Sequence, residues 1–160
     1  TIDALLKENW KQFEEDIQTA LREGVVHYPG SARPGQPGNF FVTGHSSYYP
    51  WDKGSYKDVF ARLQELEIGD TYSVYYGGDL YVYRIISKRE VKPTDVSVLD
   101  QPTRQRLASL MTCVPVGTTL RRLILTAEEI HPETGRVITN ADQRKNTTEH
   151  DLPEISVLPI

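Results

Sequence analysis

Two neighbouring apolar runs constrain the fold of this chain most. Residues 107–114 read Leu-Ala-Ser-Leu-Met-Thr-Cys-Val, and residues 121–125 read Arg-Arg-Leu-Ile-Leu. A short connection that contains Pro115 and Gly117 separates them. Apolar runs of this length that are bounded by Pro and Gly are typical of β-strands. The pair therefore predicts two adjacent strands, which would carry the only cysteine of the chain, Cys113, beside two arginines.

The remaining pattern predicts a mostly β fold. Strand-like runs stand at residues 25–28, 40–43, 71–76, 80–88, 107–112 and 120–127, with a weaker one at 136–139. Two glycines and an aspartate at 77–79 indicate a hairpin. Apolar residues at helical spacing predict a helix over 2–23 and a short one over 56–66, and 96–99 suits a turn. Short strands with few helices indicate a β-barrel or sandwich.

The length of 160 residues predicts one domain with two flanking segments. We expect an N-terminal helix at 1–24, a barrel at 25–127 and a C-terminal extension at 128–160. The helix carries one apolar stripe, so we expect it to pack on the barrel; a membrane-proximal stalk is the alternative. We expect the extension to be an extended tail that packs on the barrel or leads to an anchor. The alternative is a tail that occupies the cleft of a neighbouring molecule.

The charge balance excludes several classes of partner. The chain has 18 Lys and Arg against 22 Asp and Glu, and no basic run dominates. This balance does not predict binding to nucleic acid or to a membrane surface. No run approaches the roughly 20 apolar residues of a membrane span, so we expect neither a span nor a signal peptide within residues 1–160. The chain begins at Thr1 rather than Met, so we expect any membrane anchor to lie outside residues 1–160.

A single cysteine cannot form a disulfide within the chain, but it is a candidate nucleophile. A thiol reacts as its thiolate, which needs a basic or positive neighbour, and histidine is the usual partner. His27, His45, His131 and His150 are all open as that partner, and either adjacent arginine offers donors for an oxyanion. The alternative is that Cys113 is a buried small hydrophobic residue.

Several motifs resemble those of the sortase family. Residues 109–113, Ser-Leu-Met-Thr-Cys, resemble the sortase signature TLxTC, with Ser109 in place of the usual threonine. The run of Arg122 with Leu-Ile-Leu resembles the strand that follows that signature. Residues 38–45, Gly-Asn-Phe-Phe-Val-Thr-Gly-His, resemble the strand that ends in the Gly-His pair of the family. The resemblance extends from residue 25 to 127.

The resemblance implies a closed eight-stranded β-barrel and a cysteine transpeptidase that cleaves a Leu-Pro-x-Thr-Gly-like sorting signal between Thr and Gly. Cys113 would attack the Thr carbonyl and form a thioester, and His45 would transfer protons. Arg122 would bind the substrate backbone and the oxyanion, with support from Thr112. An amine from a peptidoglycan precursor or a pilin lysine would resolve the thioester. The enzyme would act at the extracellular face of a bacterial membrane.

Further details of the site follow from this resemblance and from strand geometry. Side chains alternate along a strand, so only one of the two arginines can face the cleft, and the family pattern favours Arg122 over Arg121. We expect Val96, Val98 and Leu99 in the 91–106 loop to form the substrate pocket; packing under a loop is their alternative role. No acidic cluster matches the calcium site of the best-known class, so we expect no metal and no cofactor.

Two other functions remain open on the sequence. A cysteine peptidase that hydrolyses the same signal would share the fold and differ only in the acceptor. A β-barrel binding or adhesion module, in which Cys113 and His45 are incidental, belongs to a different class. Reaction of the thiol with an alkylating reagent, and peptide cleavage with and without an added amine, would separate these functions.

Overall fold

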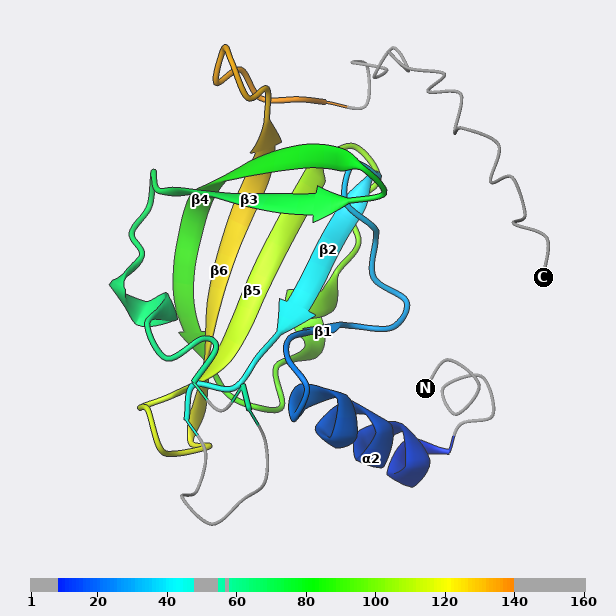
Figure 1. The fold of residues 1–160 in the computed structure, drawn as a ribbon, viewed down its shortest axis with the longest axis vertical. Helices are drawn as coiled ribbons and strands as arrows, with labels where there is room; N and C mark the ends of the chain where they lie inside the picture. The colour runs from blue at the N-terminus through cyan, green and yellow to red at the C-terminus, as the bar shows by residue number, and fades with distance from the viewer. Residues whose placement is uncertain (1–8, 48–54, 57, 140–160) are drawn as a thin grey trace, which may run out of the picture.

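One curled sheet of six strands dominates the computed structural model, which describes residues 9–47, 55–56 and 58–139. The strands are β1 (Val26–His27), β2 (Gly38–Thr43), β3 (Thr71–Tyr76), β4 (Asp79–Val91), β5 (Arg106–Val114) and β6 (Arg121–Ile130). Their order across the sheet is β1-β2-β5-β6-β4-β3, and the β3–β4 hairpin crosses in front of β5 and β6 (Figure 1). The mostly β class and the predicted hairpin are confirmed.

The sheet differs from the closed eight-stranded barrel that we predicted. The described residues form six strands, and the two edge strands, β1 and β3, are not paired with each other. β1 contributes only two residues to its ladder with β2. The connection that follows it contains Pro29, Pro34 and Pro37, which lack the N–H donor that a longer ladder needs. The described part of the chain is therefore a curled half-barrel.

The strand pairing brings the ends of three strands together. β2 runs parallel to β5, and Thr43 lies opposite Met111. β5 runs antiparallel to β6, and Cys113 lies directly opposite Arg122. The end of β2, the end of β5 and the start of β6 therefore meet at one end of the sheet. That end carries three of the predicted site motifs.

The two faces of the sheet bury different side chains because residues alternate along each strand. The larger cluster lies on the concave face and contains Val42, Leu63, Tyr81, Tyr83, Ile85, Ala108, Leu110, Val114, Leu123, Leu125 and Ala127. Phe41 and Ile124 each adjoin members of that cluster in sequence, yet they pack with Val98 in a separate cluster. The second face is thus covered by the β4–β5 connection.

The N-terminal helix, α2, spans Trp10–Leu21 and lies within the predicted range 2–23. The side chain of Asn9 accepts a hydrogen bond from the Gln12 backbone N–H at 3.2 Å, which caps the first turn. Phe13, Ile17 and Leu21 are buried and pack against residues 26 and 28. Figure 1 shows the helix beyond the β1 edge of the sheet. Residues 1–8 of the prediction lie outside the described residues.

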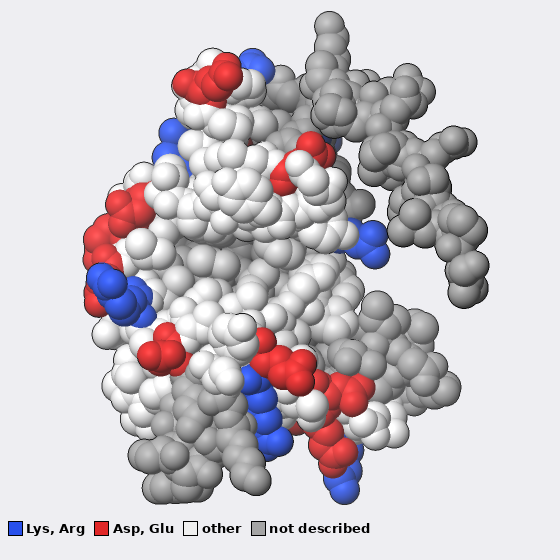
Figure 2. Space-filling view, viewed as in Figure 1, with Lys and Arg blue, Asp and Glu red and all other residues white. Residues whose placement is uncertain are grey.

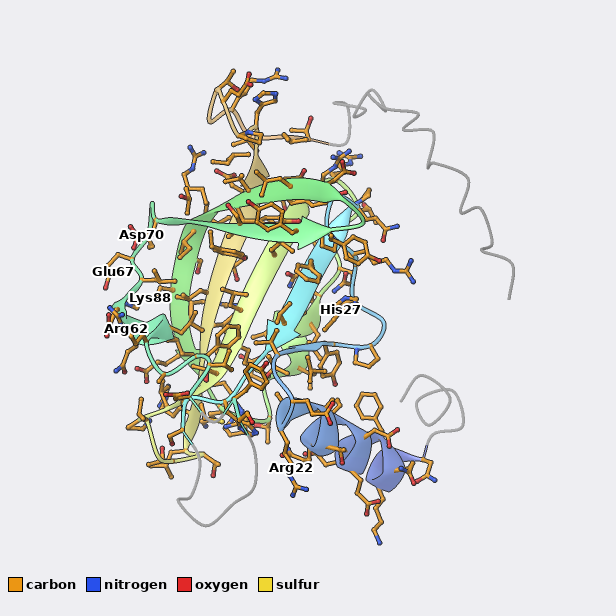
Figure 3. All side chains as sticks on the ribbon, in the orientation of Figure 1. Arg22, His27, Arg62, Glu67, Asp70 and Lys88 are labelled. Atoms are coloured by element: carbon orange, nitrogen blue, oxygen red, sulfur yellow. The ribbon has the colours of Figure 1, made fainter. Side chains whose placement is uncertain are left out.

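The predicted helix over 56–66 is wrong. The described part of this segment consists of turns and one 3₁₀ helix, η1 (Leu63–Glu65). Its backbone bonds reach back three residues, as from Leu63 N–H to the Phe60 carbonyl at 3.1 Å. The apolar residues Phe60, Leu63 and Leu66 are spaced by three throughout, which suits the three residues per turn of a 3₁₀ helix. Lys88 of β4 fastens this segment through the Gln64 carbonyl at 2.8 Å and the Glu67 carboxylate at 2.6 Å (Figure 3).

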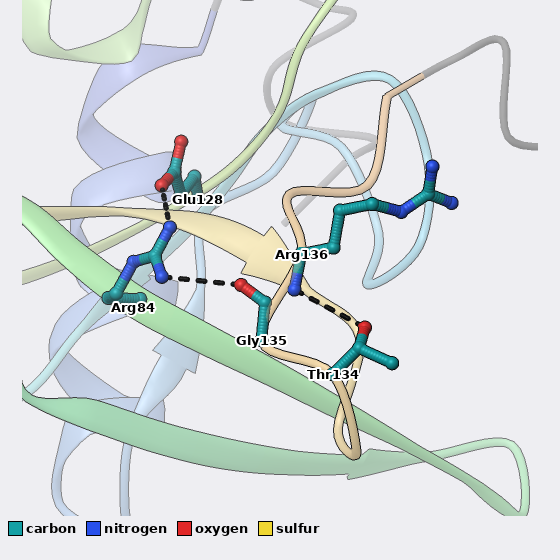
Figure 4. Close-up of polar contacts among 5 residues, drawn as sticks. All are labelled: Arg84, Glu128, Thr134, Gly135 and Arg136. Carbon is teal, nitrogen blue, oxygen red and sulfur yellow. Dashed lines mark hydrogen bonds and ion pairs between the residues drawn. The ribbon is translucent and has the colours of Figure 1, made fainter.

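The chain after β6 folds back on the sheet. Arg84 of β4 donates to the Glu128 carboxylate at 2.7 Å and to the Gly135 carbonyl at 3.3 Å (Figure 4). The weak strand predicted at 136–139 is reduced to two isolated bridges, from Val137 to Ile130 and from Thr139 to Gln105. Residues 140–160, which include His150 and most of the predicted extension, lie outside the described residues.

Charged side chains of both signs are scattered over the face drawn in Figure 2, and neither sign gathers into one large patch. Among the described residues, one ion pair is buried instead. Arg106 at the start of β5 and Glu129 near the end of β6 lie 3.7 Å apart, with Glu129 fully enclosed. This pair stands at the end of the sheet opposite to Cys113.

Candidate active site

A cavity of about 550 Å³ lies on the second face of the sheet. Cys113 of β5, Arg122 of β6 and His45, two residues beyond the end of β2, all line it. Phe41 and Met111 form part of its apolar floor. The structure therefore brings the predicted thiol, imidazole and guanidinium around one space. Their chemical roles stay predictions.

The positions of Cys113 and Arg122 follow from strand register. Residues that lie directly opposite each other in an antiparallel pair project to the same face. Both side chains are half-buried. The Arg122 Nη1 atom donates to the carbonyl oxygens of Thr119 at 3.1 Å and Arg121 at 3.3 Å. These bonds hold the guanidinium at the connection that follows Cys113, and a guanidinium has further N–H donors for a ligand.

Arg121 projects away from the cavity. It lies opposite Val114, whose side chain belongs to the concave cluster. The Arg121 Nε atom lies 3.4 Å from the Glu90 carboxylate, and its Nη2 atom donates to the Glu90 carbonyl at 3.4 Å. The arrangement agrees with the choice of Arg122, since Arg121 is an exposed side chain paired with β4.

Three backbone-directed hydrogen bonds hold the Gly44-His45 pair. The Gly44 N–H donates to the Met111 carbonyl at 3.1 Å, and the Gly44 carbonyl accepts from the Thr112 hydroxyl at 2.8 Å. The His45 carbonyl accepts from the Phe60 N–H at 2.9 Å. The first two bonds tie the histidine to the strand that carries Cys113. The third ties it to the turn segment before η1.

Gly44 also allows a close approach of the Phe60 ring. A side-chain carbon at position 44 would lie 2.6 Å from the Phe60 ring, which is too close for any real contact. The Gly of the Gly-His motif therefore has a packing reason, because Phe60 must reach the His45 backbone. In the sequence, the helix-like spacing of Phe60 and Leu63 indicates only that Phe60 packs on something, not that it packs on Gly44.

The Thr112 side chain lies outside the cavity in which an oxyanion would form. Its side chain is buried, with an exposed fraction of 2%, and its hydroxyl donates to the Gly44 carbonyl. It is absent from the residues that line the cavity. Thr112 can act on the reaction only through the backbone that carries His45.

The other histidines of the described chain stand elsewhere. The His27 Nε2 atom lies 2.9 Å from both the Ala32 carbonyl and the Ser31 hydroxyl, on the exposed β1 edge. The His131 Nδ1 atom accepts from the Glu133 N–H at 3.3 Å in the turn after β6. Neither lines the cavity. Of the histidines that the structure describes, His45 is the one placed near Cys113.

The predicted pocket residues belong to the cavity wall. Val96, Val98 and Leu99 all line it, and they form the 3₁₀ helix η2 (Val96–Leu99). Val98 is buried against the sheet, whereas Val96 is 72% exposed. Asp95 caps η2 by accepting from the Ser97 N–H at 3.1 Å and the Ser97 hydroxyl at 2.6 Å. These bonds hold the pKa of the Asp95 carboxyl below its usual value.

Gln101, which the sequence analysis missed, fastens this wall to the sheet. Its Oε1 atom accepts from the N–H groups of Ala32 at 3.1 Å and Asn39 at 2.9 Å. Its Nε2 atom donates to the carbonyls of Asn39 at 3.1 Å and Leu99 at 2.9 Å. One side chain thus joins the end of η2 to β2 and to the loop before β2. A polar residue in a loop gave no signal of this role.

Helix α2 forms a second wall that the sequence analysis also missed. Five of its residues, Phe13, Glu14, Ile17, Gln18 and Leu21, line the same cavity as Cys113. The sequence predicts a helix that packs on the barrel, and the packing of its apolar ridge agrees with this prediction. The apolar stripe of α2 packs against residues 26 and 28, and the same face of the helix borders the candidate site.

The described residues contain no group of three or more His, Cys, Asp or Glu side chains that could hold a metal ion. Within the same residues, no helix is both long enough and apolar enough to cross a bilayer. The groups that could react or bind a ligand in the cavity are a thiol, an imidazole and a guanidinium beside apolar walls. A thiolate attacks acyl carbons, an imidazole moves protons near neutral pH, and a guanidinium stabilises an oxyanion.

Comparison with known proteins identifies the family. A model described as the Sortase domain matches residues 3–130. This match covers most of the chain, so the chain belongs to the sortase family, whose members are cysteine transpeptidases. The resemblance drawn from the motifs is confirmed at the level of the family.

Individual relatives agree with this assignment. The chain is 27% identical to Sortase D of Bacillus subtilis (strain 168) over 113 residues, which are 69% of this chain and 52% of that protein. Sortase C-1 from Actinomyces oris is 29% identical with a TM-score of 0.61, over 71% of this chain and 62% of that one. The Sortase D5 transpeptidase of Clostridium perfringens is 27% identical with a TM-score of 0.57, over 67% and 62%. The chain spans about half the length of the curated relative it matches.

Proposed function

We propose that this chain is a cysteine transpeptidase that cleaves a Leu-Pro-x-Thr-Gly-like signal between Thr and Gly and transfers the acyl part to an amine. The observation that carries the proposal is the meeting of Cys113, His45 and Arg122 around one cavity with apolar walls. Membership of the sortase family supports the reaction class. In this reaction the thiol is the nucleophile, the imidazole transfers protons and the guanidinium stabilises the oxyanion.

The first half-reaction forms a thioester. The Cys113 thiolate attacks the carbonyl carbon of the substrate threonine, and the N–H donors of Arg122 stabilise the oxyanion. The bond between that carbon and the glycine nitrogen then breaks. His45, as the imidazolium, gives its proton to the departing amine. The products are an acyl-enzyme joined through sulfur and a free peptide that begins with glycine.

The second half-reaction transfers the acyl group. An incoming amine attacks the thioester carbon, and neutral His45 accepts the proton that the amine loses. The carbon–sulfur bond breaks, and the Cys113 thiolate is regenerated beside an imidazolium. The acceptor is an amine of a peptidoglycan precursor or a lysine of a pilin subunit. The enzyme then acts at the extracellular face of a bacterial membrane, on surface proteins that bear the signal.

Binding of the donor peptide uses the apolar wall of the cavity. We propose that Val96, Val98 and Leu99 contact the leucine and proline of the signal, because these side chains line the space that leads to Cys113. Thr112 acts as a positioning residue through the Gly44 carbonyl. Neither role involves a metal or a cofactor.

Mass spectrometry of the protein with a Leu-Pro-x-Thr-Gly peptide and excess triglycine tests the proposal. We expect a ligated product that is absent with the Cys113→Ala variant. Cleavage without ligation, with or without the amine, would favour the hydrolytic cysteine peptidase. Failure to cleave any member of a peptide panel, together with a thiol that resists iodoacetamide, would favour the non-enzymatic binding module.

A further inference from the structure

We propose that helix α2 forms one wall of the donor-peptide groove and that Glu14 selects for a positively charged side chain on the peptide, at a position before the scissile threonine. This inference rests on the proposed function, because it assigns specificity to the same cavity. It gives the N-terminal helix a role in recognition in addition to packing.

The face of α2 that borders the cavity is continuous. Residues 13, 14, 17, 18 and 21 line it, and positions three to four apart in an α-helix lie on one side. Phe13, Ile17 and Leu21 form the buried ridge of this face. Glu14 and Gln18 form a polar shoulder beside the ridge, and both are exposed. A peptide in the cavity would therefore meet apolar surface and one charged side chain on this wall.

The Glu14 carboxylate is held in place at the cavity. Gln18 Nε2 donates to Glu14 Oε1 at 2.8 Å, one helical turn away. The negative charge of Glu14 also reaches Tyr28, which lines the cavity from the sheet side. Burial raises the pKa of the Tyr28 hydroxyl, and the charge of Glu14 raises it further. Glu14 and Tyr28 therefore border the same space, one from the helix and the other from the sheet side.

Glu14 differs from the other charged residues of α2 in its position relative to the cavity. It is the single charged side chain that the described part of α2 contributes to the cavity lining. Glu15, the next residue, does not line the cavity and lies 4.0 Å from Lys11 on the solvent side of the helix. The facing wall offers Lys92 and Asp95, which have opposite charges. The α2 wall alone therefore presents a net negative charge to a bound peptide.

Steady-state cleavage of a matched peptide panel tests the inference. Each peptide carries Lys, Gln or Glu at the variable position of the signal or at either of the two positions before its leucine. We expect the wild-type protein to favour Lys over Glu in kcat/KM by about fivefold at one of these positions, the scale of a partly exposed ion pair. The preference should shrink in 0.5 M salt, because salt screens such pairs.

Two substitutions at position 14 and one matched control complete the test. Glu14→Gln should abolish the preference and Glu14→Lys should reverse it, whereas Glu15→Lys should retain it. Thermal melting of all three variants checks that the fold is kept. If wild-type protein cleaves the panel through Cys113 but Glu14→Lys keeps the wild-type preference, the inference fails and the proposed function stands. If wild-type protein cleaves no peptide, both fail.

Discussion

At the scale of single residues, the site depends on which side chains share a face. Cys113 and Arg122 project together because they are direct partners in an antiparallel ladder. Their neighbours Thr112 and Arg121 project to the opposite face, one onto the Gly44 carbonyl and the other toward Glu90. In each strand, one residue therefore borders the cavity, and its neighbour in sequence contacts the surrounding backbone instead.

Replacement of the two arginines should have unequal effects. Arg122→Ala should lower kcat/KM for peptide cleavage by about 10²–10³-fold, the loss expected for one oxyanion donor. Arg121→Ala removes an exposed contact with Glu90 and should change kcat/KM by less than about threefold. Parallel kinetics of the two variants measure the difference. Loss of transpeptidation in Arg121→Ala with an active Arg122→Ala would contradict the assignment.

Loss of the Thr112 hydroxyl should lower kcat more than it changes KM. Thr112→Val leaves the Gly44 carbonyl without its donor, which costs about 1–3 kcal/mol and loosens the backbone of His45. Thr112→Ser should restore kcat because it keeps the hydroxyl. Ser109→Ala is the matched control, because Ser109 lies on the same strand as Thr112 and its hydroxyl contacts Thr126 of β6 away from the cavity. A Thr112→Val variant with normal kcat would show that the bond serves stability alone.

At the scale of elements, the cavity lies between a loop and a helix that cover the same face of the sheet. The β4–β5 connection supplies η2, and Gln101 fastens that connection to β2 through Asn39. Helix α2 is fastened by an apolar ridge that packs on Val26 and Tyr28. The floor between them is made of strands whose register is set by long ladders. The walls should therefore be easier to displace than the floor.

Removal of the Gln101 side chain should weaken substrate binding. Gln101→Ala deletes four hydrogen bonds to residues 32, 39 and 99, so η2 is held to the sheet only by the packing of Val98 and by the bond from the Asn39 side chain to the Val98 carbonyl at 3.2 Å. We expect KM for the donor peptide to rise several-fold and the melting temperature to fall. Gln105→Ala is the control, because Gln105 accepts the hydrogen bond from the Gly38 N–H through its backbone carbonyl, which the substitution keeps. Equal KM values for the two variants would exclude a role of Gln101 in the groove.

At the scale of the whole molecule, stability and chemistry are located at opposite ends of the sheet. Cys113 lies seven positions after Arg106 in β5, which is roughly 23 Å of extended strand. The Arg106–Glu129 pair is almost entirely enclosed, with side chains 9% and 0% exposed. The Arg84–Glu128 pair, one residue away, is partly exposed. Only the enclosed pair leaves a buried charge when one partner is removed.

Glu129→Ala should therefore destabilise the fold without changing the chemistry. Removal of one partner of a buried ion pair costs about 3–5 kcal/mol, whereas Glu128→Ala should cost about 1 kcal/mol or less. Chemical denaturation of both variants measures the difference in the free energy of unfolding. The kcat of folded Glu129→Ala should match the wild-type value. Equal destabilisation by the two substitutions would show that burial of the pair is not the deciding term.

Local residue patterns were enough to identify the strands, the hairpin at 77–79 and the sortase motifs around Cys113 and His45, because alternation, turn residues and short signatures are properties of neighbouring positions. Alternation showed that only one of Arg121 and Arg122 can face the cleft, and the family pattern favoured Arg122. The helix predicted over 56–66 is wrong because a spacing of three residues resembles that of an α-helix over so short a run.

Contacts between distant parts of the chain determine the features of the fold and the site that the sequence did not predict. The curvature of the sheet, the hold of Phe60 on His45 and the four bonds of Gln101 join residues that are far apart in sequence, so no local pattern announces them. The same holds for α2, whose amphipathic stripe shows that one face is buried but not against what. Only the folded chain places that face beside Cys113.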